Sequence, residues 1–118
     1  MSKVEALTSE KVLSAGLMWA GFDLCRQQRV CDMTNDQRFR TYYGSGPSAV
    51  LKVYEDLLED KQELKLKDLL MAMYWLMVYP TEGQMAGMFK VCEQTARETT
   101  WRTICAIQDL KTKKVSLM

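Results

Sequence analysis

The sequence of 118 residues contains no histidine, so it lacks the side chain that most often serves as a general base or a metal ligand. No two of its cysteines have the Cys-x-x-Cys spacing of a zinc site. No glycine-rich loop with a lysine is present to hold a phosphate. We therefore expect no metal, no cofactor, no small-molecule substrate and no catalytic residue, and we expect that the protein is not an enzyme.

The four cysteines fit a different role. We expect them to be buried thiols in a reducing compartment, because free cysteine behaves as a small apolar residue. Cys92 is expected to be the most accessible, since it falls in a predicted turn. The set is Cys25, Cys31, Cys92 and Cys105.

Long apolar runs are also missing. The longest, from Leu69 to Tyr79, has 11 residues, whereas a helix that spans a bilayer needs about 20. The first residues, Met1-Ser-Lys-Val-Glu, are charged and lack the apolar stretch of a secretory signal. These features predict a protein that does not interact with membranes and that is located in the cytosol or the nucleus.

Signals for β-strands are absent too. The sequence has no sustained period-2 alternation and no Asn-Gly hairpin, and its only prolines, Pro47 and Pro80, mark helix boundaries. With 47% hydrophobic residues, a chain of this length can bury a core as one domain over residues 1–118. We predict an all-α fold, a compact bundle of about five or six helices that contains a C-terminal helix-turn-helix.

Apolar residues at helical spacing predict four helices before that motif, over residues 8–28, 34–43, 47–59 and 65–79. The first contains Gly16 and Gly21, which either weaken it or permit close packing. A polar connection is expected over residues 60–64. The last of the four is apolar nearly all round, which predicts a central core helix.

The tryptophans and the methionines of the fourth predicted helix are interpreted as core side chains. They are Trp19, Trp75, Trp101, Met71, Met73 and Met77. An alternative for Trp19 is an exposed stripe with Met18 and Phe22 that binds a partner.

The segment from Glu82 to about Leu110 has the order of a DNA-binding helix-turn-helix, with a short helix, a short turn and a longer helix. Thr81 is expected to cap the first helix, and the second is expected to begin near Glu93. Lys90 stands where the turn usually has a glycine. The residues expected to pack the two helices together are Met85, Ala86, Phe89, Val91, Ala96, Thr100, Trp101, Ile104 and Ile107.

In such a motif the first turns of the second helix enter the major groove of duplex DNA. We expect Arg97 to bind guanine, Gln94 to bind adenine and Lys90 to contact a phosphate. The full set of predicted DNA-binding residues is Lys90, Gln94, Thr95, Arg97, Glu98, Arg102, Lys111, Lys113 and Lys114, of which the last three form a basic tail. The alternative is an ordinary solvated helix face, in which Glu98 pairs with Arg102 four residues later.

Charge supports DNA binding only weakly. The net charge is +1, although residues 61–118 hold nine Lys and Arg against six Asp and Glu. Glu93 and Glu98 on the second helix also repel phosphate. A second hypothesis is therefore a non-catalytic interaction or scaffold subunit of a nuclear complex. In that case the N-terminal helix, within residues 1–33, binds a protein partner or a second copy.

Three groups of residues together resemble the N-terminal region of PIF/Harbinger-type transposases, over about residues 34–115. The first is Asp36-Gln-Arg-Phe39-Arg, Tyr43-Gly44 and Pro47; the second is Val78-Tyr79-Pro80-Thr81-Glu82; the third is Met85-Ala86, Phe89-Lys-Val91, Thr95-x-Arg97, Trp101 and Ile107-Gln-Asp-Leu110.

In that family this region is helical and binds DNA through a helix-turn-helix. The resemblance implies binding of double-stranded DNA, a nuclear location, and the surface of Gln94, Thr95, Arg97 and Arg102 as the one to test. The family's nuclease domain, with its three acidic metal ligands, follows this region, whereas the sequence stops at Met118. We therefore expect a domesticated or truncated transposase DNA-binding domain.

Overall fold

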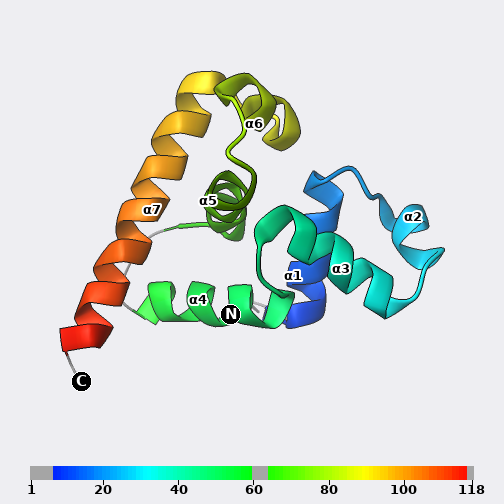
Figure 1. The fold of residues 1–118 in the computed structure, drawn as a ribbon, viewed down its shortest axis with the longest axis horizontal. Coiled ribbons are helices and arrows are strands. Elements are labelled where there is room, and N and C mark those ends of the chain that lie inside the picture. The colour runs from blue at the N-terminus through cyan, green and yellow to red at the C-terminus, as the bar shows by residue number, and fades with distance from the viewer. Residues whose placement is uncertain (1–6, 60–63, 117–118) are drawn as a thin grey trace, which may run out of the picture.

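The structure, a computed structural model, describes residues 7–59 and 64–116, with side chains as far as Thr112. The predicted polar connection over residues 60–64 lies outside the described residues except for Leu64. The described residues contain helices and no strand, which confirms the all-α prediction (Figure 1). The helices are α1 (Ser9–Trp19), α2 (Leu24–Gln28), α3 (Asp32–Tyr43), α4 (Pro47–Glu59), α5 (Leu66–Val78), α6 (Glu82–Phe89) and α7 (Glu93–Ser116).

The single helix predicted over residues 8–28 is wrong, because the chain forms α1 and α2 there. Thr8 caps α1 by accepting a hydrogen bond from the Lys11 N–H at 3.2 Å. Gly21 then has a φ of +98°, a left-handed conformation that glycine adopts without strain and that a helix cannot contain. Asp23 begins α2 by accepting from the Arg26 N–H at 2.9 Å.

The next two helices lie close to their predicted positions. α3 begins at Asp32, two residues before its predicted start at residue 34, and Cys31 is its N-cap residue. Gly44 ends α3, and its N–H donates to the Arg40 carbonyl at 2.8 Å. Pro47 is the first residue of α4, where its missing N–H costs nothing.

The core lies where α5 packs between α3 and α7 (Figure 1). Four consecutive residues of α5 are buried, namely Leu69, Leu70, Met71 and Ala72, and they follow a half-buried first turn. Met73, Tyr74 and Trp75 are half-buried, whereas Leu76, Met77 and Val78 are exposed, and Tyr79, which follows the helix, is 71% exposed. The prediction of a central core helix therefore holds for the middle of α5 and is wrong for its last turn.

The N-terminal helix α1 belongs to the same core, because it packs against α3 and α4. Gly16 lets α3 approach closely, and the buried Tyr43 hydroxyl donates to the Gly16 carbonyl at 2.7 Å. Trp19 packs on Phe89 of α6, with ring centroids 5.8 Å apart. The alternative of Trp19 in an exposed stripe is therefore wrong, although Met18 beside it is exposed.

The cysteines differ from the prediction of burial, because all four are exposed. Cys31 and Cys92 precede α3 and α7, where the chain turns at the surface. In the part of the chain that the structure describes, no helix has the length and apolarity needed to cross a bilayer.

Candidate nucleic-acid interface

The predicted pair of helices is present, with α6 and the start of α7 at the top of Figure 1 and the rest of α7 running down its left side. α6 (Glu82–Phe89) and α7 (Glu93–Ser116) are joined by the three residues from Lys90 to Cys92. α7 continues past the predicted end near Leu110. Lys111, Lys113 and Lys114 therefore lie in the helix instead of in a separate tail, and the side chains of the last two lie outside the described residues.

The start of α6 is held by a capping box. Thr81 accepts a hydrogen bond from the Gln84 N–H at 3.1 Å, and the Gln84 side chain accepts from the Thr81 N–H at 2.9 Å. Such caps stabilise a helix by about 1 kcal/mol. The predicted cap is therefore correct, and it defines where Glu82, the first residue of α6, is placed.

The turn places a lysine in a conformation that suits glycine. Lys90 has φ of 57° and ψ of 48°, which is left-handed backbone, and its N–H donates to the Ala86 carbonyl. The Val91 N–H donates to the same carbonyl at 3.1 Å. The departure from the usual glycine therefore leaves the geometry of the turn intact, while the Lys90 side chain is exposed to solvent.

The residues predicted to pack the two helices together are mostly buried. Met85, Ala86, Phe89, Ala96 and Thr100 are buried, and Val91, Ile104 and Ile107 are half-buried. The prediction for Trp101 is wrong. Its indole packs on one side against Trp75, with centroids 5.3 Å apart, and 52% of the residue is exposed. Position 101 faces outward on α7, and the contact with Trp75 of α5 shields part of the ring.

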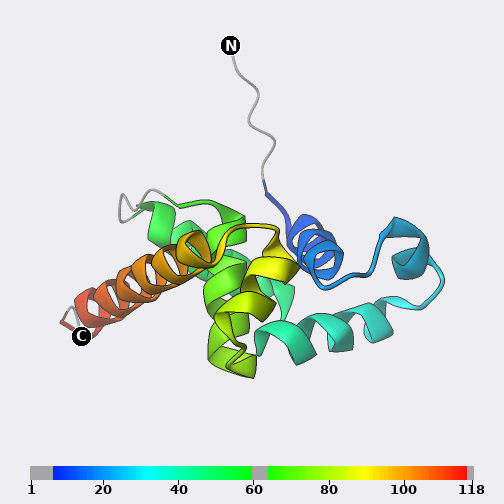
Figure 2. The same cartoon turned by 90° about the horizontal axis from the view of Figure 1, so that it is seen from above.

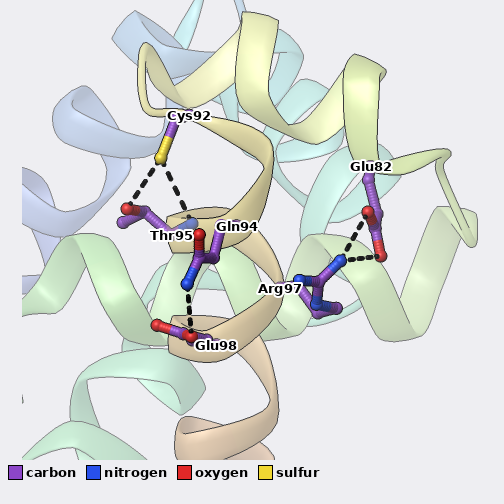
Figure 3. Close-up of polar contacts among 6 residues, drawn as sticks. All are labelled: Glu82, Cys92, Gln94, Thr95, Arg97 and Glu98. Atoms are coloured by element: carbon purple, nitrogen blue, oxygen red, sulfur yellow. Dashed lines mark hydrogen bonds and ion pairs between the residues drawn. The ribbon is translucent and has the colours of Figure 1, made fainter.

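Cys92 caps α7 and contacts Thr95 in two ways (Figure 3). Its Sγ lies 3.0 Å from the Thr95 hydroxyl and accepts from the Thr95 N–H at 3.4 Å. The Thr95 hydroxyl, followed by its backbone N–H, lowers the pKa of the Cys92 thiol below its usual value. Thr95 is thus exposed as predicted, and its hydroxyl and backbone N–H both contact the Cys92 sulfur.

Two further polar side chains on the first turns of α7 also contact neighbours (Figure 3). Gln94 donates to Glu98 at 3.0 Å. Arg97 pairs with Glu82 of α6 at 3.1 Å, and the two side chains are 50% and 48% exposed. Because solvent screens such a pair, it contributes at most about 1 kcal/mol to stability.

The predicted pair between Glu98 and Arg102 is not formed. Glu98 accepts from Gln94, and Arg102 instead approaches Asp68 of α5 at 3.9 Å. Five residues separate the two arginines, which places them about 140° apart around the helix. Arg97 and Arg102 therefore lie on opposite sides of the exposed face of α7, with Glu98 and Trp101 between them.

A small hollow lies beside the Arg97 pair. Its volume is about 40 Å³, and it lies between the two tryptophans and the start of α6. Thr100 contributes to its wall, and the buried Thr100 hydroxyl has no hydrogen-bond partner among the described residues. The hollow has room for a water molecule and is too small for a nucleobase.

Sequence reasoning did not identify Glu82 and Asp68 as partners of the arginines. The two carboxylates are 15 and 34 residues away from Arg97 and Arg102 along the chain. Helical periodicity predicts only pairs three or four residues apart, so no local signal exists for either contact.

The described residues contain no group of three or more Cys, Asp or Glu side chains arranged to hold a metal ion. The chain matches no family model, no curated protein and no solved structure.

Proposed function

We propose that this protein is a DNA-binding helix-turn-helix module that recognises duplex DNA in the nucleus with the first turns of α7. The resemblance to the N-terminal region of PIF/Harbinger-type transposases supports this proposal, because in that family the corresponding region binds DNA through a helix-turn-helix. The observation that supports this proposal is the unit of α6, a three-residue turn and α7, which leaves Gln94, Thr95, Arg97 and Arg102 exposed.

In this proposal the exposed cations divide into two roles. Arg97, one turn into α7, contacts a base edge in the major groove. Lys90 at the turn, together with Arg102 and Lys111 further along, contacts phosphates. Glu93 and Glu98 lie among these cations, and their negative charges repel the phosphates of the DNA. We therefore expect weak binding to unselected duplex DNA and a steep dependence on salt.

The test is titration of a labelled duplex at two salt concentrations with the wild type and Arg97→Ala/Arg102→Ala. The control is Arg26→Ala/Arg29→Ala, which removes the same charge from the region of α2. In both views α2 lies on the opposite side of the molecule from α7 (Figures 1 and 2).

We expect the wild type and the α2 control to bind alike at low salt. The α7 variant is expected to bind about tenfold more weakly, or weaker still. The slope of log K against log salt is expected to fall by about 0.9 for each phosphate that the variant no longer neutralises. Absence of binding by the wild type at low salt, or equal weakening in the two variants, would contradict the proposal.

A second candidate function, protein binding, is favoured by the exposed apolar residues at the end of α5. Leu76, Met77, Val78 and Tyr79 follow one another there, and Trp101 of α7 is also exposed. A shallow hollow of about 210 Å³ beside Leu76 and Met77 adds to this surface. Soluble proteins rarely expose several large apolar side chains together without a partner.

Light scattering of the purified protein and of Leu76→Ser/Tyr79→Ser tests the second candidate. If this surface binds a second copy, the wild type forms a dimer and the variant a monomer, while both retain the same helix content. Protein binding by this surface would be excluded if the wild type is a monomer and if the wild type and the variant capture the same nuclear proteins. The N-terminal helix is a poorer candidate for partner binding, because α1 packs into the core.

A further inference from the structure

The contact between Arg97 and Glu82 occupies only one nitrogen of the guanidinium. Both hydrogen bonds leave from Nη1, at 3.1 Å to Oε2 and 3.3 Å to Oε1 (Figure 3). Nε and Nη2 have no partner among the described residues, and half of the side chain is exposed. Guanine O6 and N7 accept two N–H groups from one side of a guanidinium. The edge formed by Nε and Nη2 is thus free to bind guanine.

Glu82 is well placed to orient this group. It is the first residue of α6, immediately after the capping box of Thr81, and the buried Met85 anchors the helix one turn later. An arginine without a partner samples many rotamers, and ordering it on DNA costs entropy. A carboxylate that holds Nη1 beforehand restricts those rotamers and leaves the other edge exposed.

We propose that Glu82 is a positioning residue that sets the base preference of Arg97 and makes one position of the DNA site selective for guanine. This inference rests on the proposed DNA-binding function. Glu82 acts through Arg97 and does not itself contact DNA. Its charge also repels phosphate, so it lowers affinity for every duplex while it sharpens the choice of base at one position.

The two effects of Glu82 have opposite signs, and an experiment can separate them. Selection from a randomised duplex library, followed by titration, is performed with the wild type, Glu82→Gln and Glu93→Gln. Glu93→Gln is the matched control, since Glu93 is the first residue of α7 and its carboxylate lies beside Gly83, next to Glu82, so the variant removes one negative charge from the same region. Among the described residues Arg97 pairs with Glu82 alone, so the control leaves that pair intact.

We expect the wild type to prefer guanine at one position by about tenfold over the other bases. Glu82→Gln is expected to lose most of this preference and to bind unselected duplex as tightly as the wild type or more tightly. Glu93→Gln is expected to raise affinity for unselected duplex and to keep the preference. In an Arg97→Ala background, Glu82→Gln is expected to change nothing at that position, because the group that Glu82 orients is absent.

Several outcomes would overturn this inference. A Glu82→Gln protein that keeps the wild-type preference shows that the pair does not orient Arg97, while DNA binding itself stands. Equal loss of preference in Glu82→Gln and Glu93→Gln shows an effect of charge alone. A wild type that binds no duplex overturns both this inference and the proposed function. Circular dichroism, and a Glu82→Ala variant tested in parallel, exclude loss of folding as the cause.

Discussion

Gly16 provides a sharp test of the packing, because two opposing effects decide the sign of Gly16→Ala. A Cβ at this position would overlap Cε2 of Phe39 and lie 2.8 Å from Cδ2 of Phe39 and 2.9 Å from Cε2 of Tyr43. Both rings are fully buried, so they cannot move aside into solvent.

The energies favour destabilisation. Alanine gains about 1 kcal/mol over glycine inside a helix. Overpacking a core costs about 1–3 kcal/mol. Displacement of the Tyr43 ring also weakens its 2.7 Å hydrogen bond to the Gly16 carbonyl, which contributes about 1 kcal/mol. We therefore expect Gly16→Ala to lower the free energy of unfolding by about 2 kcal/mol and the melting temperature by about 8 °C.

Gly87 provides the matched control in α6. A Cβ built there meets nothing within 4 Å. Gly87→Ala is therefore expected to gain about 0.5–1 kcal/mol from helix propensity alone. Chemical denaturation of the two variants and the wild type, followed by circular dichroism, measures both changes. A Gly16→Ala protein as stable as the wild type would refute the close approach of α1 and α3.

Three further predictions concern the turn, a buried hydroxyl and a thiol. Lys90→Gly should raise the free energy of unfolding by about 0.5–1 kcal/mol, because glycine adopts the left-handed conformation of the turn without strain. It should also weaken DNA binding, because a cation is removed. Unchanged stability in a denaturant titration would contradict the strain at Lys90. Burial raises the pKa of Tyr43 above its usual value, so the folded state keeps this proton after the unfolded state has released it. The stability that Tyr43 contributes is then complete below about pH 10 and is lost as pH rises further. Tyr43→Phe should be less stable at pH 7, since it lacks the hydrogen bond to Gly16, and its stability should fall less steeply above pH 10; an unchanged slope in pH-dependent denaturation would disprove this cause. Thr95→Val should raise the pKa of Cys92 and slow its alkylation by iodoacetamide at neutral pH. Mass spectrometry of the Cys92 peptide, with the Cys105 peptide as the internal reference, measures this rate. Equal alkylation rates of Cys92 in the wild type and Thr95→Val would show that the Thr95 hydroxyl does not activate the thiol.

Local sequence patterns determined most of the secondary structure. Apolar spacing predicted α3, α4 and α5 but missed the break between α1 and α2, Thr81 predicted the start of α6, and Pro47 predicted the start of α4. These features are readable because capping and helix termination depend on residues only a few positions apart. The same local order predicted the short helix, turn and long helix that carry the candidate interface.

Long-range packing decided what local patterns left open. Gly16 lies inside α1 and faces the rings of Phe39 and Tyr43, whereas Gly21 follows α1 in a left-handed conformation and has nothing within 4 Å of a built Cβ. The sequence alone does not distinguish these two roles of glycine. The end of α5 is as apolar as its start, yet no described element covers Tyr79.

The chemistry of the candidate interface shows the same division. The sequence by itself determined that Arg97 lies on the exposed face of a helix, since helical periodicity places it there. Only the tertiary structure decided that Glu82 holds one of its nitrogens and that Asp68 approaches Arg102. The physical reason is that a charge pair between helices depends on how those helices pack, and packing is determined by buried contacts across the whole chain.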